Sequence, residues 1–121
     1  MVNLFLVMAG GAVGAGARYL VGLQFVGMSF PWGTLAVNLI GAVLMGVLAG
    51  VLARCVVGDP VRLLLAVGVL GGFTTFSAFS LELVVMLERG NWGMALGYAL
   101  ASVIGSMVAL FAAMAAVRAL A

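Results

Sequence analysis

GGFTTFSAFS, residues 71–80, lies in the middle of a long apolar stretch and not in a loop. Two adjacent glycines followed by two threonines are poor helix formers, so this segment favours an interruption of a helix. Inside a lipid bilayer, the carbonyl groups freed by such an interruption need a protein, water or ion partner, and broken helices often hold a cation. The same residues are equally compatible with a flexible kink whose hydroxyl groups bond to the preceding turn.

The composition around this segment is that of an integral membrane protein. Of the 121 residues, 67% are hydrophobic and only 7% are charged, too few charges to cover an ordinary globular surface. The sequence has four apolar stretches, at residues 4–25, 32–53, 61–87 and 92–117. Each has at least the roughly 20 residues that a helix needs to span a bilayer. The sequence predicts a single all-α domain of four transmembrane helices, with the third helix broken near the midplane.

The few charges and reactive groups exclude several function classes. The basic residues are five scattered arginines, a distribution that argues against a nucleic-acid surface. With no histidine, one cysteine and three acidic residues, the chain has no general acid–base pair and no metal-ligand cluster. We therefore expect neither an enzyme nor a nucleic-acid-binding protein, and Cys55 is expected to be a small apolar filler.

Arginine positions give only a weak preference for one orientation in the membrane. Arg54, Arg62 and Arg118 lie at the end that holds both termini, whereas Arg89 lies at the other end. We expect insertion in both orientations and, as the natural assembly, an antiparallel homodimer. Small residues four apart mark packing faces in lipid. This chain has Gly10 with Gly14, Gly46 with Gly50, Gly68 with Gly72, Gly93 with Gly97, and then Ala101 and Gly105.

Several aromatic and hydroxyl residues are candidates for lining a pore. Phe76 and Phe79 share a helix face, and the electron-poor edges of their rings suit a small anion, although core packing is the common role of such rings. Tyr98, Ser102 and Ser106 form a stripe of about 12 Å along one helix. That stripe favours a polar track over serines bonded to their own backbone.

Three other polar residues lie inside apolar stretches. Asn38, one turn after Thr34, suits a pore wall or an interhelical clasp equally well. Arg18 is a functional candidate because a guanidinium is costly in lipid, and the alternative is that it snorkels and draws anions into a vestibule. Glu82 is expected to pair with an arginine.

Three segments together resemble one family, the Fluc (CrcB-type) fluoride channels. They are GGAVGAGARY at residues 10–19, GTLAVNLIG at residues 33–41 and GGFTTFSAF at residues 71–79. The match extends over nearly the whole chain, with its motifs in the family's order. The resemblance implies an antiparallel, dual-topology homodimer in the plasma membrane, through whose two pores fluoride leaves the cell passively.

The resemblance also implies roles for individual residues. Phe76 and Phe79 would be the paired pore phenylalanines, supplied to each pore by different subunits, with Asn38 and Ser77 near them. Tyr98, Ser102 and Ser106 would form the family's polar track. The carbonyls of Gly71 and Thr74, each supplied twice, would hold a structural sodium ion at the dimer interface. One departure is Ala78, where the family usually has threonine, and it puts any anion contact at that position in doubt.

Two other function classes are considered beside this resemblance. Small multidrug transporters also have four short helices and dual topology, but they couple transport to protons through a glutamate in the first helix. No acidic residue lies in the first apolar stretch of this chain. A non-conducting structural subunit of a membrane complex is the third possibility, and it would show no ion flux in isolation.

Overall fold

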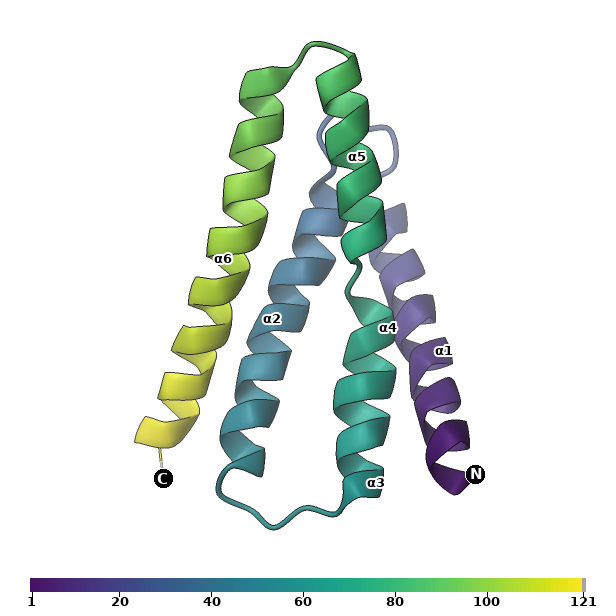
Figure 1. The fold of residues 1–121 in the computed structure, drawn as a ribbon, viewed down its shortest axis with the longest axis vertical. Helices are drawn as coiled ribbons and strands as arrows, with labels where there is room; N and C mark the ends of the chain where they lie inside the picture. Colours follow the sequence, from purple (N-terminus) through teal and green to yellow (C-terminus); the bar gives the residue numbers. More distant parts are fainter. Residues whose placement is uncertain (121) are drawn as a thin grey trace.

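Four helical segments run the length of the molecule in the computed structural model, which describes residues 1–120 (Figure 1). They are α1 (Val2–Leu23), α2 (Trp32–Leu52), an interrupted third segment over Asp59–Glu88, and α6 (Trp92–Ala119). Each is long and apolar enough to cross a membrane, with mean hydropathy between 1.6 and 2.4. The predicted all-α, multi-pass membrane fold is confirmed, and the predicted helix ends are within two residues of the observed ones.

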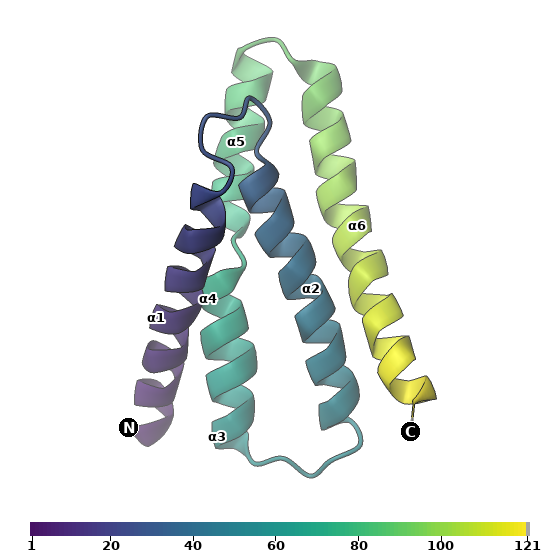
Figure 2. The ribbon, with the colours of Figure 1, turned by 180° about the vertical axis from the view of Figure 1, so that it is seen from behind.

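Both chain ends lie at the same end of the bundle as the connection between α2 and α3 (Figures 1 and 2). The connections from α1 to α2 and from α5 to α6 lie at the opposite end (Figure 2). At the end with the termini, the guanidinium of Arg54 donates a hydrogen bond to the carbonyl of Arg118. This contact joins the end of α2 to the end of α6.

The third crossing consists of four consecutive pieces: α3 (Asp59–Arg62), the π-helix η1 (Leu63–Leu70), α4 (Gly71–Phe73) and α5 (Phe76–Glu88). The predicted break is confirmed. It is confined to Thr74 and Thr75, which adopt extended conformations with ψ of 158° and 122°. The two glycines before it remain helical, so the threonines alone leave the helix.

Small residues allow the helices to approach closely at three of the predicted faces, those of Gly10 with Gly14, Gly46 with Gly50, and Gly68 with Gly72. A side-chain carbon at Gly10 would lie 2.9 Å from the Cα of Gly68, and one at Gly46 would lie 2.9 Å from the Cβ of Ala113. These contacts join α1 to η1 and α2 to α6. The expected face at Gly93 and Gly97 is wrong for packing within the chain, because a side-chain carbon there meets no atom of residues 1–120 within 4 Å.

Candidate functional site

The helix break is held by one side chain of α2. The amide nitrogen Nδ2 of Asn38 donates to the carbonyl of Thr75 at 3.0 Å, and Oδ1 accepts from the Thr75 backbone N–H at 2.8 Å. Thr75 also caps α5, because its hydroxyl accepts a hydrogen bond from the backbone N–H of Ala78 at 3.2 Å. The break is therefore a built conformation and not a loose kink, and Asn38 is an interhelical clasp.

A cavity of about 370 Å³ lies beside the break, between α2, α5 and α6. We call it the polar groove. Its lining includes five of the residues predicted for a pore: Asn38, Phe76, Phe79, Ser102 and Ser106. The remaining wall is formed by Gly41, Ala42, Met45, Thr74, Thr75 and Val103. No charged side chain lines the groove among the described residues.

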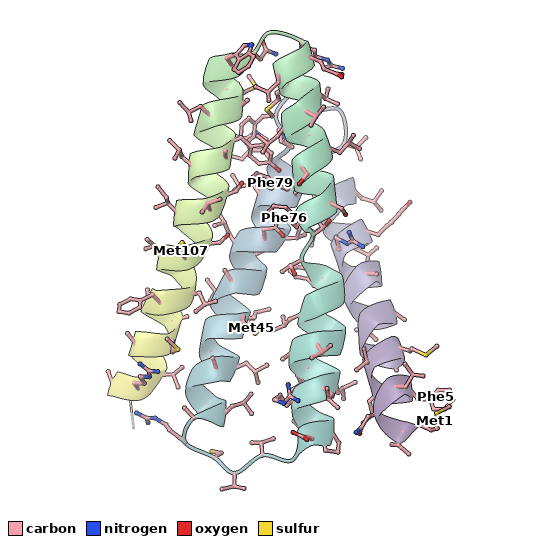
Figure 3. The ribbon with its side chains drawn as sticks, viewed as in Figure 1. Met1, Phe5, Met45, Phe76, Phe79 and Met107 are labelled. Carbon is pink, nitrogen blue, oxygen red and sulfur yellow. The ribbon has the colours of Figure 1, made fainter. Side chains whose placement is uncertain are left out.

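The two phenylalanines occupy the first turn of α5, directly after the break (Figure 3). Their ring centroids are 5.6 Å apart and the planes are tilted by 57°. Phe79 is buried and packs edge-on against Tyr98, with a centroid distance of 5.0 Å. Phe76 is 75% exposed in the single chain. The ring of Phe79 is therefore held by the core, whereas the ring of Phe76 is largely uncovered by the described residues.

Ser102 presents an unusual hydroxyl to the groove. The residue is only 6% exposed, yet its Oγ atom has no hydrogen-bond partner among the described residues. A buried hydroxyl without a partner costs free energy, and such groups in native proteins call for an explanation. Ser102 also lines the polar groove, so this buried hydroxyl lies beside the cavity.

Tyr98 lies on the predicted stripe but outside the groove. It is fully buried, and its hydroxyl donates to Oε2 of Glu82 at 3.4 Å, while the hydroxyl of Thr34 donates to Oε1 at 2.5 Å. The expected pairing of Glu82 with an arginine is wrong: among residues 1–120 the ion pair is that of Arg62 with Asp59, at 3.5 Å. No local sequence pattern marks this hydroxyl–carboxylate cluster.

Arg18 lines a second cavity, of about 420 Å³, which we call the Arg18 cavity. Thr34, Ala78 and the two phenylalanines of the connection between α1 and α2, Phe25 and Phe30, also line it. Thr75 lines both this cavity and the polar groove, so this residue lies between the two. Ser77 lies outside both cavities; it is exposed, with its hydroxyl 3.4 Å from that of Thr75.

The break also changes the hydrogen bonding of the carbonyls before it. In a regular helix the N–H of Thr75 would bond to the carbonyl of Gly71, four residues earlier. Here that N–H is bonded to Asn38 instead, and Gly71 is exposed on the surface of the chain. Thr74 is in the extended conformation, so its carbonyl also leaves the helical direction.

Comparison with known proteins agrees with this architecture. Residues 5–114 match the family model described as CrcB-like protein, Camphor Resistance (CrcB). Relatives named fluoride-specific ion channel FluC include one from Mesorhizobium japonicum, 52% identical over 92% of both chains, and one from Chelativorans sp., 56% identical over 92% of both. A third, from Sphingopyxis alaskensis, is 52% identical over 98% of this chain and 97% of its own. The chain belongs to the CrcB-like family.

Proposed function

We propose that this protein is a fluoride channel of the plasma membrane that lets fluoride leave the cytoplasm passively. The observation that carries the proposal is the unpartnered hydroxyl of Ser102 in an uncharged groove beside two phenylalanine rings. Relatives about half identical over most of their length bear the name of fluoride-specific ion channels. The family and the absence of catalytic groups both support a channel and not an enzyme.

The groove offers many weak partners to a small anion instead of one strong site. The hydroxyls of Ser102 and Ser106 and the ring edges of Phe76 and Phe79 each replace part of a water shell. Weak sites in series allow an ion to leave as readily as it arrives. Arg18, half-buried in the neighbouring cavity, raises the local concentration of anions without binding them in the groove.

A second copy of the chain would complete the groove. In the single chain Phe76 is 75% exposed and Ser106 is half-buried, so the open side of the groove would otherwise face lipid, at a cost in free energy for its polar groups. An antiparallel homodimer, with one pore along each groove, covers both grooves by the same contact. The weak arginine bias is consistent with insertion in both orientations.

The carbonyls of Gly71 and Thr74 are our choice for a structural sodium ion between the two copies. The fit rests on the Gly71 carbonyl, whose usual helical donor is engaged by Asn38, and on the preference of hard cations for oxygen ligands. A bound cation would supply a fixed positive charge near the pores. Replacing sodium by a large organic cation during purification should lower the thermal stability of the dimer.

A proton-coupled transporter is the other candidate from the four-helix class. No acidic residue lies in α1, and both carboxylate oxygens of Glu82 are engaged by hydroxyl groups. A channel conducts fluoride along its own gradient at any pH difference across the membrane. Transport driven by a proton gradient alone would favour the transporter.

The decisive experiment is ion efflux from liposomes that contain only this protein. We expect fluoride to leave and chloride to be retained, and sealed vesicles would contradict the proposal. The native Cys55, exposed in the connection between α2 and α3, reports orientation. An impermeant thiol reagent should label about half of the copies in intact spheroplasts, as a chain without strong orientation bias requires.

A further inference from the structure

Two residues of α2, one turn apart, contact the two residues of the helix break. Asn38 bonds to the backbone of Thr75, and Gly41 lies against the side chain of Thr74. Residues three apart share a helix face, so both contacts come from the same side of α2. The polar groove lies on this side, since all four residues line it.

The contact at Gly41 leaves no room for a side chain. A carbon added at Gly41 would overlap the methyl carbon Cγ2 of Thr74, and its other neighbours are at ordinary contact distances, 3.6 Å from Phe73 and 3.7 Å from the Thr74 Cβ. The obstruction is therefore a single methyl group. Gly41 is buried, so the added carbon has no other direction to take.

The Thr74 methyl cannot turn away without loss. Threonine is branched at Cβ, so one χ1 rotation moves both the methyl and the hydroxyl. The hydroxyl donates to the carbonyl of Leu70 at 3.0 Å in the present rotamer. Rotation of the methyl away from α2 breaks that bond, and without rotation the break itself must move away from α2.

We propose that Gly41 is a positioning residue, which sets how closely the helix break approaches α2 and thereby keeps Asn38 within hydrogen-bond distance of Thr75. The inference rests on the proposed function for its flux measurement, but not for its stability measurement. A displaced break would lengthen the two Asn38 bonds and change the width of the polar groove. Gly41 would thus act on conduction through Thr74 and not by contact with the ion.

The test is a double-mutant cycle of four proteins: wild type, G41A, T74S and G41A/T74S. Serine keeps the hydroxyl that bonds to Leu70 and removes the methyl that obstructs position 41. We expect G41A to lower the initial fluoride efflux rate by about tenfold or more and to lower Tm, because overpacking displaces the backbone. T74S alone sets the reference for both quantities, because Thr74 itself lines the polar groove, and G41A/T74S should have a rate and a Tm close to those of T74S and well above those of G41A.

The matched control is G16A on α1, where an added carbon meets no described atom within 4 Å. Its Tm and efflux rate should equal those of wild type. Normal efflux and Tm in G41A would overturn the inference, as would a double variant as slow as G41A, since that result means the new methyl obstructs the groove directly. If the wild-type protein shows no fluoride efflux, the proposed function is contradicted. The Tm values of the four proteins then test the positioning role of Gly41 by themselves.

Discussion

The side-chain amide of Asn38 occupies both backbone hydrogen-bonding groups of Thr75, donating to its carbonyl at 3.0 Å and accepting from its N–H at 2.8 Å. The amide thus replaces the partners that Thr75 would have in a continuous helix. In N38L both groups lose their partners in a buried region, at a cost of about 1–3 kcal/mol for each group. We expect a clearly lower Tm in detergent and no fluoride efflux.

The control for this variant is N91L, because Asn91 is exposed and its side chain makes no cap hydrogen bond to α6. Surface substitutions of this kind usually change stability by less than about 0.5 kcal/mol. If N38L were as stable as N91L, water would satisfy the backbone N–H and carbonyl of Thr75, and the bonds from Asn38 would be dispensable.

Ser102 should separate stability from conduction. Its hydroxyl is buried without a partner, so S102A removes a desolvated group and should leave Tm unchanged or slightly raised. The same variant should slow fluoride efflux, because a hydrogen-bond donor is lost from the groove. S80A is the control, since Ser80 lies outside the two cavities described here. A fall in Tm with unchanged efflux would make the Ser102 hydroxyl a structural group.

The two groove phenylalanines should respond differently to replacement by leucine. F76L changes an exposed ring and should suppress efflux with little change in Tm. F79L also removes the edge contact with Tyr98 and should suppress efflux while costing up to about 1.5 kcal/mol of stability. Phe5, exposed on α1 and far from the break, provides the control F5L (Figure 3). Normal efflux in both groove variants would refute their assignment to the pore.

Arg18 is expected to act through its field, which makes its effect depend on salt. In R18Q the efflux rate should fall at low ionic strength, where charges act over about 30 Å at 0.01 M. The difference from wild type should shrink at 1 M, where the screening length is about 3 Å. The measurement is the ratio of the initial efflux rate of R18Q to that of wild type, taken in each of the two buffers. A deficit of equal size in both buffers would instead assign Arg18 a direct contact or a structural role.

Glu82 should matter first for the packing of three helices. E82Q replaces one of the two acceptor oxygens by a donor, so either the Thr34 or the Tyr98 hydroxyl loses its partner. We expect a loss of about 1–2 kcal/mol in stability. T34V should cost more than Y98F, because the Thr34 bond is 2.5 Å long and the Tyr98 bond 3.4 Å. Melting temperatures of the three variants in one detergent test this order.

Hydropathy and helix propensity were enough to predict the four crossings and the break, because both depend on local composition. The exact residues of the break were harder to predict. Gly71 and Gly72 remain helical, and Gly72 lies so close to α1 that an added carbon would be 2.6 Å from the carbonyl of Gly11. Gly72 therefore serves packing between helices, which its spacing from Gly68 indicates and its helix propensity does not. The π-helix at Leu63–Leu70 was missed for a related reason, since a uniformly apolar run carries no mark of its hydrogen-bond register.

The candidate site was predicted in part because residues on one helix stripe do share a side of the helix. Ser102 and Ser106 line the polar groove, and their role in a pore stays a prediction. Tyr98 does not line the groove, because the ring of Phe79, from another helix, covers Tyr98. Glu82 was assigned the wrong kind of partner because the hydroxyls of Thr34 and Tyr98 come from two other helices. Contacts between elements decide both cases.

Thr75 lines both the Arg18 cavity and the polar groove. An ion that crosses both compartments in turn meets them as resistances in series, and the largest of these limits the total current. We expect a change of one methyl group at residue 75 to act on the partition between the two compartments, and thereby on the passage of an ion from one to the other.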